Sequence, residues 1–137
     1  MQTINITTNI KAPKQKVWEY LNDPKHIVNW NFAHESWSCP SAENDLKVGG
    51  TFKNRMEAKD GSFGFDFEGT YDEIKDLEEI KYHLADGRKV ETKFTQNEDG
   101  STTLMQNFEP ESENDIEMQK AGWQAILDNF KKYVEEN

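Results

Sequence analysis

Hydrophobic and polar residues alternate with a period of two over much of the chain, and this pattern predicts β-strands. In segment 2–10, Ile4, Ile6, Thr8 and Ile10 share one face. The same alternation recurs in five later segments, 51–58, 63–71, 78–84, 88–95 and 101–109. Such regular alternation indicates a sheet with one buried and one solvated face, which is typical of antiparallel sheets.

Three aspartate–glycine pairs stand between these segments, and each predicts a tight turn. They are Asp60-Gly61, Asp86-Gly87 and Asp99-Gly100. Strands that follow one another through tight turns form an antiparallel meander. The segment 31–50 is less regular, and there we expect a short strand at 34–39, a loop from Ser41 to Asp45 and a turn at Gly49-Gly50.

Proline and capping residues mark two short helices directly after the first strand. Pro13 opens the first helix, because proline is tolerated at the first helical position, and Val17 lies on the apolar face of this helix. Asp23 is placed to cap a second helix that begins at Pro24.

An apolar stripe with helical spacing predicts one long helix over residues 115–135, about 30 Å in length. Asn114 is the predicted N-cap, and Glu117 completes a pattern like a capping box. The stripe comprises Met118, Gly122, Ala125, Ile126, Leu127, Phe130 and Tyr133. We therefore expect a single α+β domain over residues 1–137, in which a curved antiparallel sheet wraps around the C-terminal helix and encloses a partly polar cavity.

Short motifs follow one another along the chain in a characteristic order. They are Val17-Trp18, Asp23-Pro24, Trp30, Asp45-Leu-Lys-Val-Gly-Gly50, Met56, Asp60-Gly61, Gly69-Thr-Tyr-Asp-Glu-Ile74 and Gly122-Trp123. Together they resemble the AHSA-type family, named after the activator of the heat-shock-protein-90 ATPase, within the START/Bet v-like (SRPBCC) superfamily. The resemblance implies a helix-grip fold with a ligand cavity between the sheet and the long helix. It leaves three roles open: binding a small molecule, catalysing a cyclase- or hydrolase-type reaction, and assisting a chaperone.

Aromatic residues make up 12% of a chain that is only 34% hydrophobic, so large rings dominate its apolar surface. Rings bury a large area each, and those of Trp and Tyr add a polar tip, which suits planar ligands. We expect Trp30, Phe32, Trp37, Met56, Phe65, Phe67, Tyr82, Phe108, Trp123 and Phe130 to line the cavity. Its mouth is expected at residues 30–40 and at the turns near Gly61 and Gly87. The alternative is a core that these rings fill completely.

Three polar residues share a strand face with apolar neighbours and are therefore expected to point inward. They are Asn54, Arg88 and Gln106. Burying a polar group without a partner costs roughly 1–3 kcal/mol, so these groups need a ligand, water or one another. Arg88 stands next to a turn, where a side chain reaches solvent. Gln106 points inward only if Leu104 and Phe108 do, which spacing alone does not decide.

Candidate catalytic chemistry is sparse. His34 is a further predicted cavity residue, and Cys39 lies five positions on, so a thiol–imidazole pair is conceivable, with a buried inert cysteine as the alternative. The remaining histidines, His26 and His83, do not give the spacing of a zinc site, and we expect neither a metal nor another cofactor. The chain has neither a glycine-rich phosphate loop nor a G-x-S-x-G motif.

Charge and hydropathy limit the partners. The net charge is −10, with 26 acidic and 16 basic residues and no basic stripe, which disfavours nucleic acid and anionic membranes. No apolar run approaches the roughly 18 residues of a membrane helix, and the N-terminus lacks the features of a signal peptide. We expect a cytoplasmic protein that binds a small hydrophobic or aromatic ligand, with an enzymatic role in the same cavity or a chaperone-associated role as alternatives.

Overall fold

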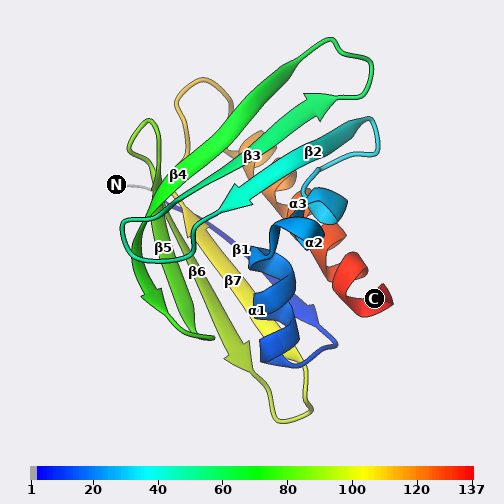
Figure 1. The fold of residues 1–137 in the computed structure, drawn as a ribbon, viewed down its shortest axis with the longest axis vertical. Helices are drawn as coiled ribbons and strands as arrows, with labels where there is room; N and C mark the ends of the chain where they lie inside the picture. Colours follow the sequence, from blue (N-terminus) through cyan, green and yellow to red (C-terminus); the bar gives the residue numbers. More distant parts are fainter. Residues whose placement is uncertain (1–2) are drawn as a thin grey trace.

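The computed structural model describes residues 3–137, and within this range seven strands and three helices follow one another in the predicted order. Figure 1 shows their arrangement. The elements are β1 (Ile4–Ile10), α1 (Lys14–Asn22), α2 (Pro24–Trp30), β2 (Trp37–Asn44), β3 (Thr51–Ala58), β4 (Gly64–Lys75), β5 (Glu79–Leu84), β6 (Lys89–Gln96), β7 (Thr102–Phe108) and α3 (Ile116–Glu136). Gln2, in the predicted first strand, lies outside the described residues.

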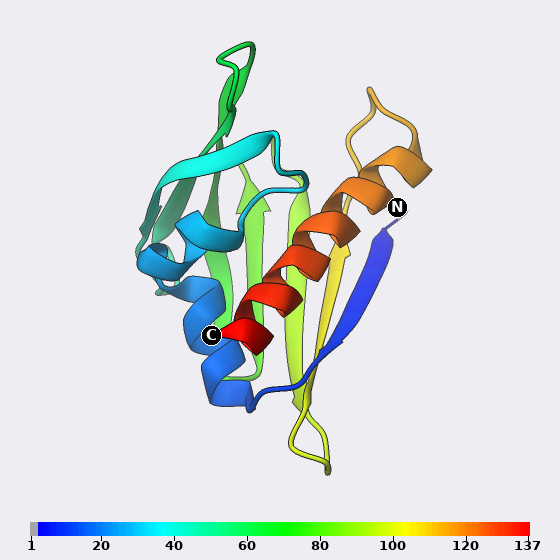
Figure 2. The ribbon, with the colours of Figure 1, turned by 90° about the vertical axis from the view of Figure 1, so that its right-hand side faces the viewer.

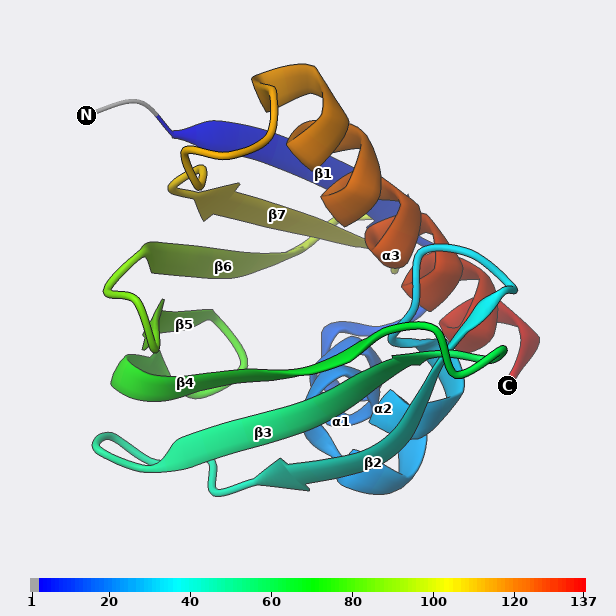
Figure 3. The same ribbon diagram turned by 90° about the horizontal axis from the view of Figure 1, so that it is seen from above.

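The strands form one antiparallel sheet in the order β1-β7-β6-β5-β4-β3-β2. Strands β2 to β7 lie side by side in the order of the sequence. Strand β1 instead pairs with β7, so that Ile4 lies opposite Phe108. Seen from above, the sheet curves from β1 round to β2, and the three helices lie on its inner side (Figure 3).

The long helix α3 runs diagonally across the concave side of the sheet, beside β1 (Figure 2). Its buried side chains are Leu127, Phe130 and Val134. The ring of Phe130 packs edge-on against Trp30 of α2, with the ring centroids 4.8 Å apart. The helix-grip α+β fold is thereby confirmed. Among residues 3–137, none of the helices combines the length and the apolar character needed to cross a membrane.

Local sequence signals place most elements correctly. Asp23 caps α2 by accepting a hydrogen bond from the backbone N–H of Lys25, as predicted. Pro13 is the N-cap of α1 rather than its first residue. Each of the three aspartate–glycine turns has its glycine at positive φ, and Gly87, at +92°, adopts a conformation that other residues rarely reach.

Three further local predictions are wrong. Residues Ser41–Asn44 continue β2 and pair with β3, although they read as a loop, because an edge strand tolerates polar residues and a proline at a bulge. The N-cap of α3 is Asp115, whose carboxylate accepts from the N–H of Met118. Met118 itself is 59% exposed, whereas Ile116 in the same turn of α3 packs against the core.

Candidate functional site

A cavity of about 380 Å³ lies between the concave face of the sheet and α3. This volume is within the range of pockets that hold small molecules. Its wall is mainly apolar and aromatic, with contributions from the sheet, α2 and α3. The apolar lining includes Ile27, Trp30, Phe52, Met56, Phe65, Phe67, Tyr71, Tyr82, Trp123, Ile126, Leu127 and Phe130.

Rings from different elements hold one another in the cavity wall. Trp123 of α3 stacks on Phe108 of β7, with centroids 3.9 Å apart and planes 11° from parallel, and meets Phe67 edge-on. On the sheet side, Phe52 packs edge-on against Tyr82 at 4.8 Å. A Cβ at Gly69 would lie 2.9 Å from the Phe52 ring and 2.6 Å from a backbone oxygen. Glycine at this position therefore leaves room for the ring.

Most polar groups in the wall have partners within the protein. The hydroxyl of Tyr71 donates to Oδ1 of Asn44 over 2.6 Å, and Nδ2 of Asn44 donates to the backbone oxygen of Asn22 over 2.7 Å. Nε2 of Gln106 donates to the hydroxyl oxygen of Thr92 over 3.2 Å. These groups are therefore part of the protein's own hydrogen-bond network.

Asn54 of β3 is different. Its side chain lines the cavity, is 8% exposed, and its Oδ1 has no hydrogen-bond partner in the described part of the chain. Its strand neighbours in register are Ala42 and Phe67, neither of which has a polar side chain. Asn54 thus lines the cavity and carries a buried side-chain oxygen that has no partner in the described residues.

Burial also determines the state of the two tyrosines in the wall. Desolvation raises the pKa of Tyr82, and the neighbouring Tyr71 adds to the effect. Desolvation likewise raises the pKa of Tyr71, although its bond to Asn44 acts in the opposite direction. Both hydroxyls are therefore protonated and neutral at physiological pH.

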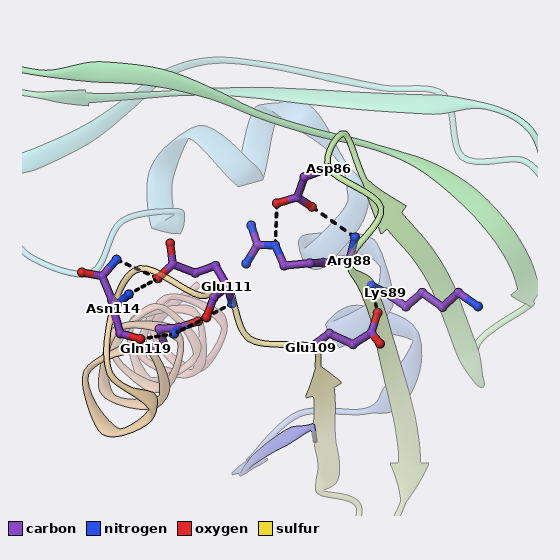
Figure 4. Close-up of polar contacts among 7 residues, drawn as sticks. All are labelled: Asp86, Arg88, Lys89, Glu109, Glu111, Asn114 and Gln119. Carbon is purple, nitrogen blue, oxygen red and sulfur yellow. Dashed lines mark hydrogen bonds and ion pairs between the residues drawn. The ribbon is translucent and has the colours of Figure 1, made fainter. Parts of the chain in front are cut away.

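Three polar residues border the cavity where the β5–β6 turn approaches the segment between β7 and α3. They are Arg88, Glu111 and Gln119, here called the polar rim (Figure 4). Asp86 holds Arg88 by accepting from its backbone N–H over 3.1 Å and from its Nε over 2.7 Å. Burial acts to raise the pKa of Asp86, but the hydrogen bonds and charge of Arg88 outweigh it and lower that pKa. The ion pair is therefore complete at neutral pH.

The structure brings ten of the predicted cavity residues to the lining. They are Trp30, Asn54, Met56, Phe65, Phe67, Tyr82, Arg88, Gln106, Trp123 and Phe130. The register of β7 is now settled, with Gln106 opposite Thr92 of β6 and pointing inward.

Four predicted residues do not line the cavity. Phe108 is fully buried behind Trp123 and forms a second layer. Phe32 and His34 lie in the connection between α2 and β2, where no strand period fixes their direction, and His34 is exposed and bonded to Ser36. Trp37 begins edge strand β2 and meets the rings of Phe63 and Phe65. The mouth was predicted at residues 30–40 and at the turns near Gly61 and Gly87. Of these segments, the residues that line the cavity are Trp30, Asn31 and, beside the Gly87 turn, Arg88.

Sequence reasoning missed several polar lining residues. Asn44 falls in the segment that was read as a loop, and Glu111 lies in the irregular connection after β7. Gln119 lies on α3 but is not part of the apolar stripe that predicted this helix. Tyr71 lies in the alternating segment 63–71, but its bond to Asn44 spans 27 positions and has no local signal.

Cys39 and His34 do not form a catalytic pair. The Cys39 side chain is buried, its thiol donates to the backbone oxygen of Ser41, and His34 bonds to Ser36 instead. Desolvation raises the pKa of Cys39 to about 11, and the hydrogen bond only partly opposes this. A thiol in this state is a poor nucleophile at neutral pH.

Away from the cavity, Glu19, Asp23 and His26 bring possible metal-ligand atoms within 4.8 Å of one another. Two of the three also take part in ordinary structural contacts. Asp23 caps α2, and Nδ1 of His26 shares a hydrogen bond of 2.8 Å with the hydroxyl of Tyr133. The ring of Tyr20 stacks on His26. These contacts account for the grouping without an ion.

The curved sheet, the gripping helix and the cavity between them define a helix-grip domain. The chain belongs to the family described as "Activator of Hsp90 ATPase homolog 1-like protein", which matches residues 11–135. The resemblance seen in the sequence motifs is thereby confirmed. A search of functionally curated proteins found no match.

Several solved structures are similar to this chain. The AHSA1-like protein from Aeromonas hydrophila is 41% identical, with a TM-score of 0.91 over 98% of this chain and 93% of that one. A protein from Cytophaga hutchinsonii is 47% identical, with a TM-score of 0.84 over the same shares of the two chains. A protein from Chromobacterium violaceum is 24% identical and has a TM-score of 0.87 over the whole of both chains, which shows the shared fold alone.

Proposed function

We propose that the chain binds a small, largely apolar or aromatic molecule in the cavity between the sheet and α3. The observation that carries this proposal is Asn54, a side-chain amide buried in an aromatic wall with its Oδ1 unpartnered. Leaving such a group unpaired costs roughly 1–3 kcal/mol, and a ligand that bonds to it removes the cost.

The amide also indicates one feature of the ligand. An asparagine side chain offers both a donor and an acceptor, and a hydroxyl group can donate and accept in turn. A hydroxyl on a flat apolar body therefore matches Asn54 in either orientation of its amide plane. The surrounding rings of Phe52, Phe67 and Trp123 supply apolar contact.

The proposal is tested by thermal unfolding of the protein against a panel of lipids, hydroxylated aromatic compounds and hydrophobic amines. A ligand present at about 100 times its Kd stabilises the folded state by roughly 2.7 kcal/mol. We expect a saturable rise in Tm that Asn54→Leu strongly reduces. Asn29→Leu is the matched control. It makes the same substitution outside the cavity, because Asn29 is exposed on α2. Failure of every compound to shift the melt would exclude the proposal.

An enzymatic role in the same cavity is the first alternative. Its ionisable lining in residues 3–137 consists of Arg88, Glu111, Tyr71 and Tyr82. A cyclase- or hydrolase-type reaction would have to use these groups as proton donors or acceptors. Mass spectrometry of each bound compound after prolonged incubation distinguishes binding from conversion.

A chaperone-associated role is favoured by an exposed aromatic cluster that adjoins the cavity through Phe65. Phe63 is 60% exposed and Phe65 42% exposed on the β3–β4 hairpin, and both rings meet Trp37 edge-on at about 6 Å. Exposed aromatic clusters of this kind mark protein-binding surfaces. If this role holds, the protein stimulates the ATPase of a heat-shock-protein-90 chaperone and Phe63→Ser abolishes the effect.

A further inference from the structure

The polar rim carries two opposite charges that do not pair with each other. Arg88, just before β6, and Glu111, between β7 and α3, both line the cavity. The guanidinium of Arg88 extends toward the Glu111 side (Figure 4). In residues 3–137 no ion pair within 4.0 Å joins these two side chains.

Each of the two side chains is fixed by neighbours on its own side. Asp86 binds Arg88 through Nε, and in the described chain neither Nη atom makes a hydrogen bond. On the other side, Oε1 of Glu111 accepts from the backbone N–H and from Nδ2 of Asn114, over 2.7 and 2.8 Å. Gln119 clamps the Glu111 backbone by accepting from its N–H and donating to its oxygen. The two Nη atoms of Arg88 and Oε2 of Glu111 therefore have no hydrogen-bond partner among residues 3–137.

The charges around the rim discriminate between possible end groups of a ligand. A carboxylate would meet Arg88 but would also face Glu111 and Asp86, whose charges repel it. An ammonium group would be attracted by Glu111 and Asp86, but it would face the charge of Arg88 and could not accept a hydrogen bond from its free Nη atoms. A neutral group with an acceptor beside a donor satisfies both sides and meets no like charge.

We propose that the polar rim binds a neutral end group of the ligand, of carboxamide type, whose oxygen accepts from Arg88 and whose N–H donates to Glu111. This inference rests on the proposed binding function, because the apolar body of the ligand must lie in the cavity. It adds selection for an uncharged hydrogen-bonding end group over an acid or an amine.

The test uses probes that share one aromatic body and differ only in the end group. They are 2-naphthamide, 2-naphthoate and 2-naphthylmethylammonium, with naphthalene itself as the probe without a polar group. Affinities are measured at pH 7 by titration of the NMR signals of the Trp123 and Phe130 side chains, which line the cavity. We expect the carboxamide to bind at least about tenfold more tightly than either charged probe.

Two substitutions reverse the selection in opposite directions. Glu111→Gln removes the charge that repels the acid, so the affinity for 2-naphthoate rises roughly tenfold, whereas Arg88→Met raises the affinity for the ammonium probe. Arg55→Met and Glu98→Gln are the matched controls. They make the same charge changes outside the cavity and keep the wild-type preference.

The outcomes separate the two proposals. If naphthalene shifts the cavity signals but the three end groups bind equally in the wild type and in both variants, the inference fails and the binding function stands. If the charged probes bind best and the controls change selectivity as much as the rim variants, long-range charge governs binding and the inference is overturned. If no probe, naphthalene included, shifts the cavity signals, both proposals fail.

Discussion

Replacing Asn54 by leucine is expected to stabilise the ligand-free protein. The side chain is 8% exposed, its Oδ1 lacks a partner, and the cavity wall around it is largely aromatic. Leucine has the same branching at Cγ as asparagine, with two methyl groups in place of the polar amide atoms. The substitution therefore removes the cost of an unsatisfied group without creating a large void.

The size of the effect follows from that cost. An unsatisfied buried polar group costs roughly 1–3 kcal/mol, so Asn54→Leu is expected to raise the free energy of unfolding by about this amount. With 137 residues and roughly 2.1 cal/mol/K of unfolding entropy per residue, each kcal/mol changes Tm by about 3.5 °C. The expected rise is thus about 3–10 °C.

The assay is urea unfolding at 25 °C followed by circular dichroism, with a thermal melt as the second measurement. Thr92→Val is the matched comparison, because Thr92 is also buried in the cavity wall but accepts a hydrogen bond from Gln106. Loss of the Thr92 hydroxyl leaves the amide of Gln106 without that partner, so Thr92→Val is expected to lower the free energy of unfolding by about 1 kcal/mol.

Opposite signs for the two variants would therefore support the distinction between satisfied and unsatisfied groups. If Asn54→Leu lowers the unfolding free energy by about 1 kcal/mol or more, Asn54 has a structural partner in solution, such as bound water, and the reasoning is wrong.

Three further measurements address other parts of the structure. The raised pKa of Cys39, about 11 through burial, predicts that iodoacetamide at pH 8 labels the protein only in denaturant, and mass spectrometry of the folded protein checks this. Phe130 is fully buried, so Phe130→Ala is expected to cost about 3–5 kcal/mol in urea unfolding, and a loss below about 1 kcal/mol would contradict its place in the core. The hydroxyl and the backbone N–H of Ser101 bind Asp99 and lower its pKa. The folded state therefore gains stability above the unfolded pKa of about 3.9 and loses it as the pH falls through the lower folded value. Asp99→Asn should accordingly lower the free energy of unfolding more at pH 7 than at pH 2.5. An equal loss at both pH values would show that the Asp99 carboxylate does not gain stability from its bonds to Ser101.

Period-two alternation predicted the sheet because one face of every strand must be buried. The segment 51–58 coincides with β3, and Ile4, Ile6 and Ile10 are all buried, as their shared face requires. Polar residues weaken this signal at the edge of the sheet. The segment Ser41–Asn44 pairs on one side only, so its sequence does not need to alternate cleanly.

The cavity was predictable only in part, for a related reason. Alternation tells which side chains point inward, and it selected Asn54, Phe67 and Tyr82 correctly. It does not tell which inward side chains meet one another across the sheet. Phe108 points inward but is covered by Trp123, and the partner of Tyr71 lies 27 positions away.

The packing of the wall explains how an aromatic cavity can stay open. Trp123 is held between Phe108 and Phe67, which belong to two different strands, and Phe130 is held against Trp30 of α2. A ring that is clamped from a second element cannot turn into the space without losing that contact. The wall therefore has its shape without a ligand, and the proposed binding would require little ordering of it. The unpaired amide of Asn54 is the interior feature that the proposed ligand would change most, because the rings around it already have partners.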